Sequence, residues 1–273
     1  MRLSFEVFPP KPSDGIEHIY GCLDELASLH PEFISVTYSA GNAQKGLTAE
    51  VCGHIKRKYG IKAVSHLTCT GTTKESLQRE VGVLKDNGVD TILALRGDIT
   101  PEKGLTDFHH ATELMEELNR LGGFSLCGAC YPEGHGESGC YHEDITVLKR
   151  KYDLGVRTFI SQLFFDNADY LRMKELAFKA GIDATFCAGI MPALSVGSLI
   201  RMVSLSAAKL PPEMKKLVDA YRYDNKSMRQ AGLEYAIKQI RDLIKEGCED
   251  IHLYTMDNAA VTKTLYDGVK DLL

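Results

Sequence analysis

The segment KDNGVDTILAL, residues 85–95, runs from a charged helix end through a glycine and an apolar residue into an apolar strand. Three other segments follow the same order: YDLGVRTFISQ (152–162), FKAGIDATFCA (178–188) and KEGCEDIHLY (245–254). Glycine adopts the left-handed conformation that commonly ends a helix at little steric cost. The glycines that fit this position are Gly88, Gly155, Gly181 and Gly247. A recurring junction of this kind predicts repeated strand–helix units that wind in one direction.

Short apolar or β-branched runs recur along the whole chain, as expected for parallel strands covered by helices. They are LSFEVF (3–8), FISVTY (33–38), KAVSHLTC (62–69), TILALRG (91–97), SLCGACY (125–131), TFISQLFF (158–165), ATFCAGIM (184–191) and DIHLYTM (250–256). Segments with helical spacing of apolar residues lie between them, such as ATELMEELNRLGG (111–123). An open doubly wound sheet would fit this alternation, but about eight strands favour a closed barrel. We therefore predict an α/β fold, a single (β/α)8 barrel.

Residues 1–273 are predicted to form one domain, because no linker rich in Pro, Gly or Ser and no low-complexity tract divides them. The longest gap between predicted strands runs from about Met191 to Glu249. It contains the helical segment PPEMKKLVDAY (211–221). We expect this gap to be an elaborated connection after the seventh strand.

Composition is that of an ordinary globular protein, with 44% hydrophobic and 25% charged residues and a formal net charge of −5. No dense block of Lys and Arg occurs, which argues against a nucleic-acid partner or an anionic membrane surface. The first residues, MRLSFEVFPP, lack the uninterrupted apolar run of a signal peptide, and no run is long enough to cross a bilayer. We expect a cytoplasmic protein without a membrane partner.

The eight cysteines are expected to be free thiols, mostly buried as small apolar groups. Cys127 and Cys130 have the spacing of redox or zinc sites, with Cys140 nearby. They lie in the strand-like run SLCGACY, where we expect both to point to the same side or to flank a bend. No second C-x-x-C completes four ligands, and His66 and His135 lack metal-binding spacing. We therefore predict no metal site and expect the histidines to stack or to form hydrogen bonds.

Polar side chains follow most of the predicted strands at the point where each one ends. In a barrel of parallel strands these ends converge on the active site. The set comprises Glu6, Thr37, Tyr38, His66, Arg96, Asp98, Tyr131, Glu133, His135, Gln162, Tyr254 and Thr255. A barrel would bring these distant residues together, which makes them the strongest functional signal that the sequence offers by itself.

Glu6 is a carboxylate inside an otherwise apolar strand. It could be an edge residue that faces solvent. The apolar residues around it and the Pro9-Pro10 pair after the strand favour a position at the barrel mouth. A carboxyl group half-buried there can hold a proton at neutral pH, which a general acid requires.

Two charged groups of residues have both a structural and a functional interpretation. Arg96 and Asp98 could form an ion pair at a strand end. Alternatively, Gly97 lets the backbone approach a ligand, and Asp98 accepts hydrogen bonds from that ligand and lowers the reduction potential of an electron-rich ring. Arg150 and Lys151 could lie on a solvated helix face, or they could clamp a cofactor phosphate.

Eight motifs, taken in order, resemble those of the methylenetetrahydrofolate reductases of the bacterial catalytic-domain type. They are FEVFPPK (5–11), SVTYSA (35–40), HLTC (66–69), LRGD (95–98), YPEGH (131–135), LKRK (148–151), SQLFFD (161–166) and HLYT (252–255). Each is weak alone, but eight in order over nearly the whole chain are specific. The resemblance implies a (β/α)8 barrel that holds FAD non-covalently and assembles into a homo-oligomer.

The resemblance also implies an activity, the reduction of methylenetetrahydrofolate to methyltetrahydrofolate by a ping-pong route. A reduced nicotinamide, NADH or NADPH, first passes hydride to the flavin and leaves. The folate then binds over the same flavin face and receives the hydride. A partner subunit could replace the nicotinamide as the electron donor.

By the same resemblance, Glu6 is the general acid that helps to open the folate ring, Asp98 tunes the flavin and meets the pterin, and Gln162 binds substrate. The family's FAD-binding positions are occupied here by Thr37, Tyr38, Ala40, His66, Arg96, Gly97, Asp98, Ala111, Tyr131, His135, Asp144, Arg150 and Lys151.

Three expected substrate-binding positions depart from the family pattern. Met202 stands where an aromatic residue is frequent, Ser198 where glutamine is usual, and Asn258 lies in the segment after HLYT where an arginine is common. FAD binding is therefore better supported than the identity of the electron donor, and a donor subunit predicts weak NADH oxidation by the isolated chain. Two other functions remain open: an accessory flavoprotein subunit of an electron-transfer complex, and a barrel hydrolase or aldolase.

Overall fold

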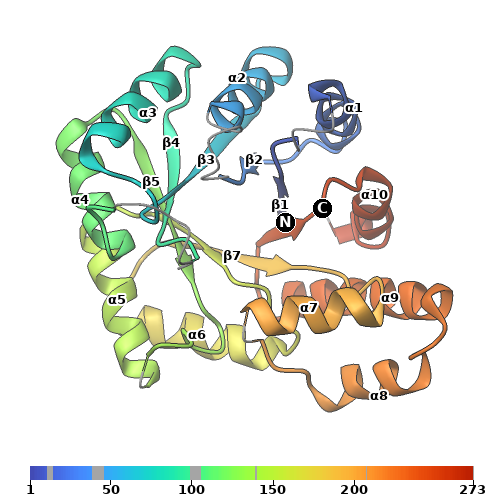
Figure 1. Cartoon of the computed structure of the whole chain (residues 1–273). Helices are drawn as coiled ribbons and strands as arrows, with labels where there is room; N and C mark the ends of the chain where they lie inside the picture. Colours follow the sequence, from blue (N-terminus) through green and yellow to red (C-terminus); the bar gives the residue numbers. More distant parts are fainter. Residues whose placement is uncertain (11–14, 39–45, 99–105, 139, 207, 273) are drawn as a thin grey trace.

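Eight parallel strands close into a barrel in a computed structural model of the chain, which describes residues 1–10, 15–38, 46–98, 106–138, 140–206 and 208–272 (Figure 1). The strands are β1 (Arg2–Val7), β2 (Phe33–Val36), β3 (Lys62–Thr68), β4 (Thr91–Leu95), β5 (Ser125–Cys130), β6 (Thr158–Ser161), β7 (Thr185–Ile190) and β8 (Asp250–Tyr254). Each lies within or beside one of the eight predicted runs. The prediction of a single (β/α)8 barrel is confirmed.

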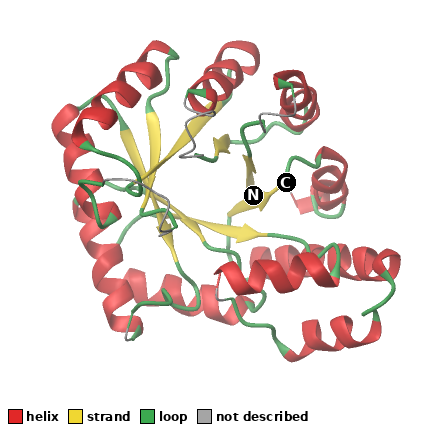
Figure 2. Cartoon of the chain, viewed as in Figure 1, coloured by secondary structure: helices red, strands yellow, loops and turns green. Residues whose placement is uncertain are grey.

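Helices surround the barrel on its outside (Figure 2). They are α1 (Ile16–Ala27), α2 (Leu47–Tyr59), α3 (Lys74–Asp86), α4 (Ala111–Leu121), α5 (Tyr141–Asp153), α6 (Asn167–Lys179), α7 (Val196–Ser206), α8 (Pro212–Ala220), α9 (Asn225–Lys245) and α10 (Ala259–Asp267), followed by a short 3-10 turn, Lys270–Leu272. Each strand pairs with its neighbour in sequence, and β1 pairs with β8 to close the ring.

The four junction glycines have the predicted left-handed backbone, with φ of +72° at Gly88, +99° at Gly155, +74° at Gly181 and +80° at Gly247. In each case the next residue's N–H donates back to a carbonyl of the preceding helix, as Val89 does to Leu84 at 2.9 Å. This is the pattern that ends a helix and satisfies its last carbonyls. The apolar residue after each glycine is buried, so the junction also fixes the start of the next strand against the core.

Inside the barrel, one side chain from each of the strands β2 to β7 contributes to a separate apolar layer. Its members are Phe33, Val64, Leu93, Cys127, Ile160 and Cys187. A larger core lies between the strands and the helices. Cys127 belongs to the inner layer and Cys130 to the outer core, so the expectation that they share a side is wrong. Strand side chains alternate between faces, and residues three apart therefore point in opposite directions.

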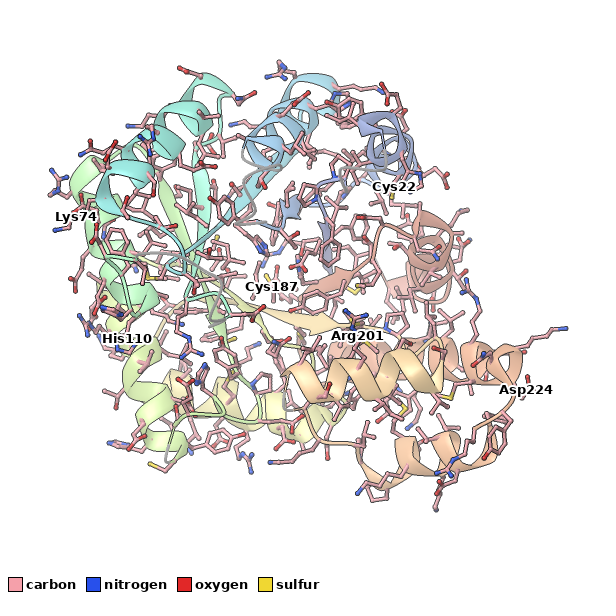
Figure 3. The ribbon with its side chains drawn as sticks, in the orientation of Figure 1. Cys22, Lys74, His110, Cys187, Arg201 and Asp224 are labelled. Carbon is pink, nitrogen blue, oxygen red and sulfur yellow. The ribbon has the colours of Figure 1, made fainter. Side chains whose placement is uncertain are left out.

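All eight cysteines are free, and all except Cys140 are buried, as predicted. Figure 3 shows Cys187 near the barrel centre and Cys22 at its periphery. Within the described ranges, no group of His, Cys, Asp and Glu side chains is arranged to hold a metal ion. The same part of the chain contains no helix that is both long enough and apolar enough to span a membrane.

The connection between β7 and β8 contains α7, α8 and α9, which confirms the predicted elaboration after the seventh strand. These helices share an apolar cluster of their own, which includes Leu199 of α7, Met214 of α8 and Met228 of α9. Gly232 of α9 packs so closely on the segment after β7 that a methyl group there would overlap the carbonyl group of Ala193. This close approach fixes α9 against the end of β7.

Replacement of Gly232 by Ala should lower the free energy of unfolding by about 1–3 kcal/mol, because the backbone must shift to relieve the overlap. Gly82, in the middle of α3, is a matched control because an added methyl group meets nothing within 4 Å. Gly82→Ala should raise the free energy of unfolding by about 0.5–1 kcal/mol, through better helix propensity. Urea unfolding of both variants measures the two effects; a neutral Gly232→Ala would contradict the close packing.

Candidate functional site

Two cavities open at the carboxyl ends of the strands. The inner cavity, of about 450 Å³, is lined from β1, β2, β3, β4, β5, β6, β8 and the loops after them. The outer cavity, of about 420 Å³, lies between α4 and α5. The two adjoin, because they share the lining residues Leu95, Arg96, Ala129, Tyr131, His135 and Glu137. Together they form a groove from the barrel interior to its outer helices.

Most of the predicted site residues line this groove. The inner cavity contains Glu6, Thr37, His66, Arg96, Gly97, Asp98, Tyr131, His135 and Gln162. The outer cavity adds Ala111, Asp144, Arg150 and Lys151. These residues come from β1, β3, α4 and α5 and from the loops after β2, β4, β5 and β6, so the convergence expected from a barrel is present.

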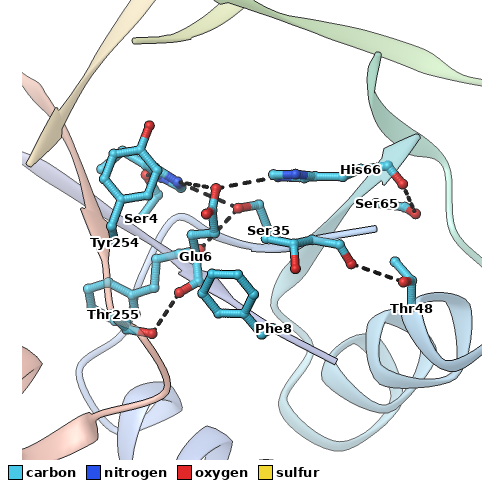
Figure 4. A network of polar contacts seen from close by, with 12 residues as sticks. Ser4, Glu6, Phe8, Ser35, Thr48, Ser65, His66, Tyr254 and Thr255 are labelled. Carbon is cyan, nitrogen blue, oxygen red and sulfur yellow. Dashed lines mark hydrogen bonds and ion pairs between the residues drawn. The ribbon is translucent and has the colours of Figure 1, made fainter. Parts of the chain in front are cut away.

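Glu6 lies inside the barrel near the end of β1, and the alternative of a solvent-facing edge residue is wrong. It is only 9% exposed. Its Oε2 lies 3.6 Å from Nε2 of His66 (Figure 4) and 3.8 Å from Nε2 of His252. Its backbone carbonyl accepts a hydrogen bond of 2.6 Å from the Thr255 hydroxyl. A single carboxyl group therefore faces the inner cavity with an imidazole on each of two sides.

His66 is held as a neutral imidazole. Burial lowers the pKa of His66 below its usual value, with Glu6 opposing this shift and His252 adding to it. Its Nε2 is buried and forms no hydrogen bond with the described residues. A buried polar atom without a partner is costly, and a ligand in the inner cavity could satisfy it.

Tyr254 closes the inner cavity on the side of β7. Its hydroxyl donates to the Ser161 carbonyl at 2.6 Å, and burial raises the pKa of Tyr254 well above its usual value. Gly189 of β7 makes room for this ring, because a side chain there would overlap both Tyr254 and the Ser161 carbonyl. The phenol is therefore neutral and its proton is already engaged.

The Arg96-Gly97-Asp98 turn brings backbone to the cavity surface. Gly97 has a φ of +80°, and a Cβ there would lie 2.9 Å from Cβ of Thr68. Both observations require glycine at this position. Arg96 forms an ion pair with Glu137, a residue that the sequence did not single out and that lines both cavities.

Lys151 is buried, so its interpretation as a solvated helical residue is wrong. Its Nζ donates to the Ala129 carbonyl at 2.8 Å. Burial lowers the pKa of Lys151 to about 8, although Cys130 and Asp144 oppose the shift. Arg150 beside it is exposed and pairs with Glu116 at 2.8 Å. A buried ammonium group has lost the solvation that water provides, and an anionic ligand in the outer cavity would stabilise it.

The loop between β5 and α5 has a Gly-x-Gly-x-x-Gly spacing, GHGESG at 134–139, which was not among the predicted site features. Gly139 lies outside the described residues. Asp144 of α5 shapes the loop by accepting from the His135 N–H at 3.2 Å and from the Ser138 hydroxyl at 2.7 Å. Gly134 has a φ of +90° and lies against the same carboxylate. Glycine spacing between a strand and a helix could have identified this loop as a ligand contact.

Six predicted residues among those the structure describes do not line the groove: Tyr38, Glu133, Ser198, Met202, Thr255 and Asn258. Glu133 accepts from the Lys209 N–H at 2.8 Å, and the Thr255 hydroxyl donates to the Glu6 carbonyl. Tyr38 packs on the main core, and Met202 on the cluster of the seventh connection. Ser198 hydrogen-bonds to Ser195 within the first turns of α7, and Asn258 caps α10 by accepting from the Val261 N–H at 3.1 Å. Ala40 lies outside the described residues. Their contacts with a cofactor or substrate stay predictions. Leu205 and Ser206 of α7 line the inner cavity, and nothing in the sequence pointed to them.

Comparison with known proteins gives a consistent result. The family model described as methylenetetrahydrofolate reductase matches residues 1–270. The 5,10-methylenetetrahydrofolate reductases of Pectobacterium carotovorum subsp. carotovorum and Escherichia coli (strain K12) are 33% and 32% identical to this chain over 262 residues, which is 96% of this chain and 88% of each relative. The methylenetetrahydrofolate reductase (NADH) 1 of Zea mays is 30% identical, over 94% of this chain and 46% of its own length.

A solved structure supports the fold alone. An uncharacterized protein from Clostridium thermocellum, described as binding two copies of 5-methyl-5,6,7,8-tetrahydrofolic acid, superposes with a TM-score of 0.70 at 12% identity. The match covers 99% of this chain and 94% of that one.

The buried ammonium group predicts a specific dependence of stability on pH. The folded pKa of Lys151 is about 8, below the usual 10.5, so between these values the unfolded chain binds a proton that the folded chain does not. The cost of the buried charge is fully present below pH 8 and disappears as pH rises toward 10.5. In this window the wild type should gain stability relative to Lys151→Met, by up to about 1.4 kcal/mol per pH unit.

Urea unfolding at pH 7.5 and 9.5 measures this gain. Groups that titrate in both the wild type and the variant contribute equally to their free energies of unfolding, so their contributions cancel in the comparison. Lys149 is a half-exposed lysine of the same helix, paired with Asp153. Wild type against Lys149→Met should show no comparable rise. A flat difference for Lys151→Met would mean that its ammonium group is not desolvated.

Proposed function

The chain belongs to the methylenetetrahydrofolate reductase family, and from that premise we propose that it reduces methylenetetrahydrofolate to methyltetrahydrofolate with the help of bound FAD. The observation that carries the proposal is the buried Glu6 carboxyl group in the wall of a cavity at the strand ends. The names of the bacterial relatives support the substrate. Family membership does not favour the hydrolase or aldolase alternatives.

The groove has features that suit FAD. It is elongated, with an inner chamber beside polar side chains and an outer chamber beside a buried ammonium group. Lys151 and Arg150 would hold the phosphates in the outer chamber, together with the N-terminal end of α4. Thr37, His66, Asp98 and the backbone at Gly97 would hold the ring system. When bound, FAD would supply a hydride acceptor and donor, chemistry that no side chain provides.

Glu6 is the group best suited to donate a proton to the folate. Opening the folate's five-membered ring to an iminium requires a proton on the departing nitrogen. His66 and Tyr254 are less suited, because His66 is neutral and the Tyr254 hydroxyl is committed to Ser161. The Glu6 carboxyl group is buried in the cavity wall and would act as the general acid.

Gln162 would orient the folate. Its Oε1 accepts from the Leu163 N–H at 2.8 Å, which fixes the side-chain amide at the end of β6. That bond leaves the amide N–H groups to face the inner cavity, where they can donate to a ligand. This orientation supports the proposed role of Gln162 as a substrate-binding amide.

We propose NADH or NADPH as the electron donor, with a partner subunit as the alternative. The Zea mays relative carries NADH in its name, which supports a nicotinamide. Ser198, Met202 and Asn258 are proposed to contact the folate or the nicotinamide. Assembly into a homo-oligomer is proposed from family resemblance alone.

Substitution of Glu6 by Gln should separate the two halves of the reaction. The amide cannot donate the acid proton, so oxidation of the reduced flavin by methylenetetrahydrofolate should slow by about 10²- to 10⁴-fold. Reduction of the flavin by the donor needs no such proton and should stay within about twofold of wild type. Anaerobic stopped-flow absorbance measures both steps.

Glu25→Gln provides the matched control, since Glu25 is an exposed carboxylate of α1 outside both cavities. It should leave both half-reactions unchanged. If Glu6→Gln oxidised its flavin with the folate at the wild-type rate, Glu6 would not be the general acid.

A further inference from the structure

A second polar layer lies behind Glu6, on the side away from the inner cavity. It consists of Ser4, Ser35 and His252, none of which lines either cavity. Ser35 and His252 are completely buried, and Ser4 is 3% exposed. Polar side chains in a closed barrel interior are expensive unless they are paired or serve a function. The proposed reaction, as described so far, uses none of the three.

Strand register brings this layer against Glu6. Ser4 pairs with His252 and Glu6 pairs with Tyr254 across β1 and β8, while Glu6 pairs with Ser35 across β1 and β2. Because strand side chains alternate, Ser4 and Glu6 share the inner face of β1. His252 therefore has Ser4 on one side and the Glu6 carboxyl group on the other.

The imidazole of His252 is held at both nitrogens. Its Nδ1 lies 2.8 Å from the Ser4 hydroxyl, and its Nε2 lies 3.5 Å from the Ser35 hydroxyl and 3.8 Å from Oε2 of Glu6. The ring of Phe33 stacks on it with centroids 5.6 Å apart, and Tyr254 contacts it edge-on at 5.5 Å. These contacts fix the plane of the ring, so that Nε2 points toward Glu6.

The position of the ring proton depends on the direction of the Ser4 hydrogen bond. The Ser4 hydroxyl lies 2.8 Å from Nδ1 and 3.3 Å from the Ile251 carbonyl oxygen, and its single proton can be donated to one of them. If Ser4 donates to Nδ1, a neutral His252 carries its proton on Nε2. That N–H faces the Glu6 carboxyl group.

We propose that Ser4 and His252 are positioning residues for Glu6: the serine orients the imidazole, and the imidazole N–H, whose nitrogen lies 3.8 Å from Oε2, stabilises electrostatically the carboxylate that remains after proton donation. This inference rests on the proposed function for its catalytic meaning. The pair acts from behind the acid and touches no ligand. It differs from His66, which lines the inner cavity and whose Nε2 forms no hydrogen bond with the described residues.

Among the residues that the structure describes, three titratable side chains lie against Glu6. They are His252 and Tyr254 from β8 and His66 from β3. Tyr254 and His66 are neutral, since burial raises the pKa of the phenol and lowers the pKa of the imidazole. Loss of the His252 N–H should therefore weaken the stabilisation of the carboxylate that remains after proton donation.

The first test uses the flavin-free chain and so does not depend on the proposed activity. Histidine labelled with ¹⁵N reports which ring nitrogen carries the proton, and the signal missing from His252→Gln identifies His252. The wild type should show the Nε2–H form, and the signal should move with pH as Glu6 titrates. Ser4→Ala should shift the ring toward the Nδ1–H form, and Glu6→Gln should abolish the movement with pH.

The second test measures oxidation of the reduced flavin by methylenetetrahydrofolate as a function of pH. Ser4→Ala and His252→Gln should slow this step about 10- to 100-fold, the range expected when a reacting group is misplaced. The pH of half-maximal rate should move upward by about one unit, which a purely structural defect would not produce. His54→Gln is the matched control, since His54 of α2 stacks on Tyr20 far from the site. It should leave both the rate and the pH profile unchanged.

Ser4→Ala removes one oxygen atom and keeps the test valid if His252→Gln fails to fold. An Nδ1–H ring in the wild type, or an unmoved pH profile in Ser4→Ala, would overturn the proposal. Absence of any folate reaction in the wild type would instead refute the proposed function. In that case the labelled-histidine measurement still decides whether Ser4 and His252 control Glu6.

Discussion

Pairing between the first and last strands is the constraint on which the site depends. β1 pairs with β8 from Arg2 opposite Asp250 to Glu6 opposite Tyr254. This pairing joins two segments that are nearly the full length of the chain apart. Arg2 and Asp250 add a two-pronged ion pair at 2.7 and 2.8 Å, but one so exposed contributes at most about 1 kcal/mol. Backbone hydrogen bonds and the burial of Phe5, Ile251 and Leu253 hold β1 and β8 together. A slip of one residue would turn Glu6 from the inner face to the outer core.

Closure also explains how a carboxyl group comes to lie inside an apolar barrel. The barrel interior contains an apolar layer from β2 to β7, whereas Ser4 of β1, Ser35 of β2, His66 of β3 and His252 of β8 supply the hydroxyl and imidazole groups around Glu6. Of these polar residues on β1 and β8, Glu6 lines the inner cavity, whereas Ser4 and His252 behind it are buried. An acid in this position is shielded from bulk water and remains open to a ligand. We infer that proton donation takes place at Glu6, between β1 and β8, while the outer cavity would provide positive charge for cofactor binding.

The barrel itself could be predicted from sequence because its signals are local. The glycine junctions and the strand runs each depend on a few neighbouring residues, and the structure reproduces them. Strand ends likewise predicted which residues would converge, including Glu6, His66, Arg96 and Gln162. Lys151 was ambiguous, because burial of a helical lysine depends on the space that Gly128 leaves beside it. The lining residues of α7 could not be foreseen, since the path of the seventh connection follows from packing such as that of Gly232 on Ala193.

We propose that a folate exchanges hydride with a flavin held in this groove. To test this, the chain is loaded with FAD and flavin absorbance is followed, without oxygen, while methyltetrahydrofolate, the proposed product, is added. The flavin should bleach, because the reverse reaction returns hydride to it. If a chain that binds FAD kept its full absorbance with excess methyltetrahydrofolate, hydride exchange with the folate would be excluded and an accessory electron-transfer role would be favoured.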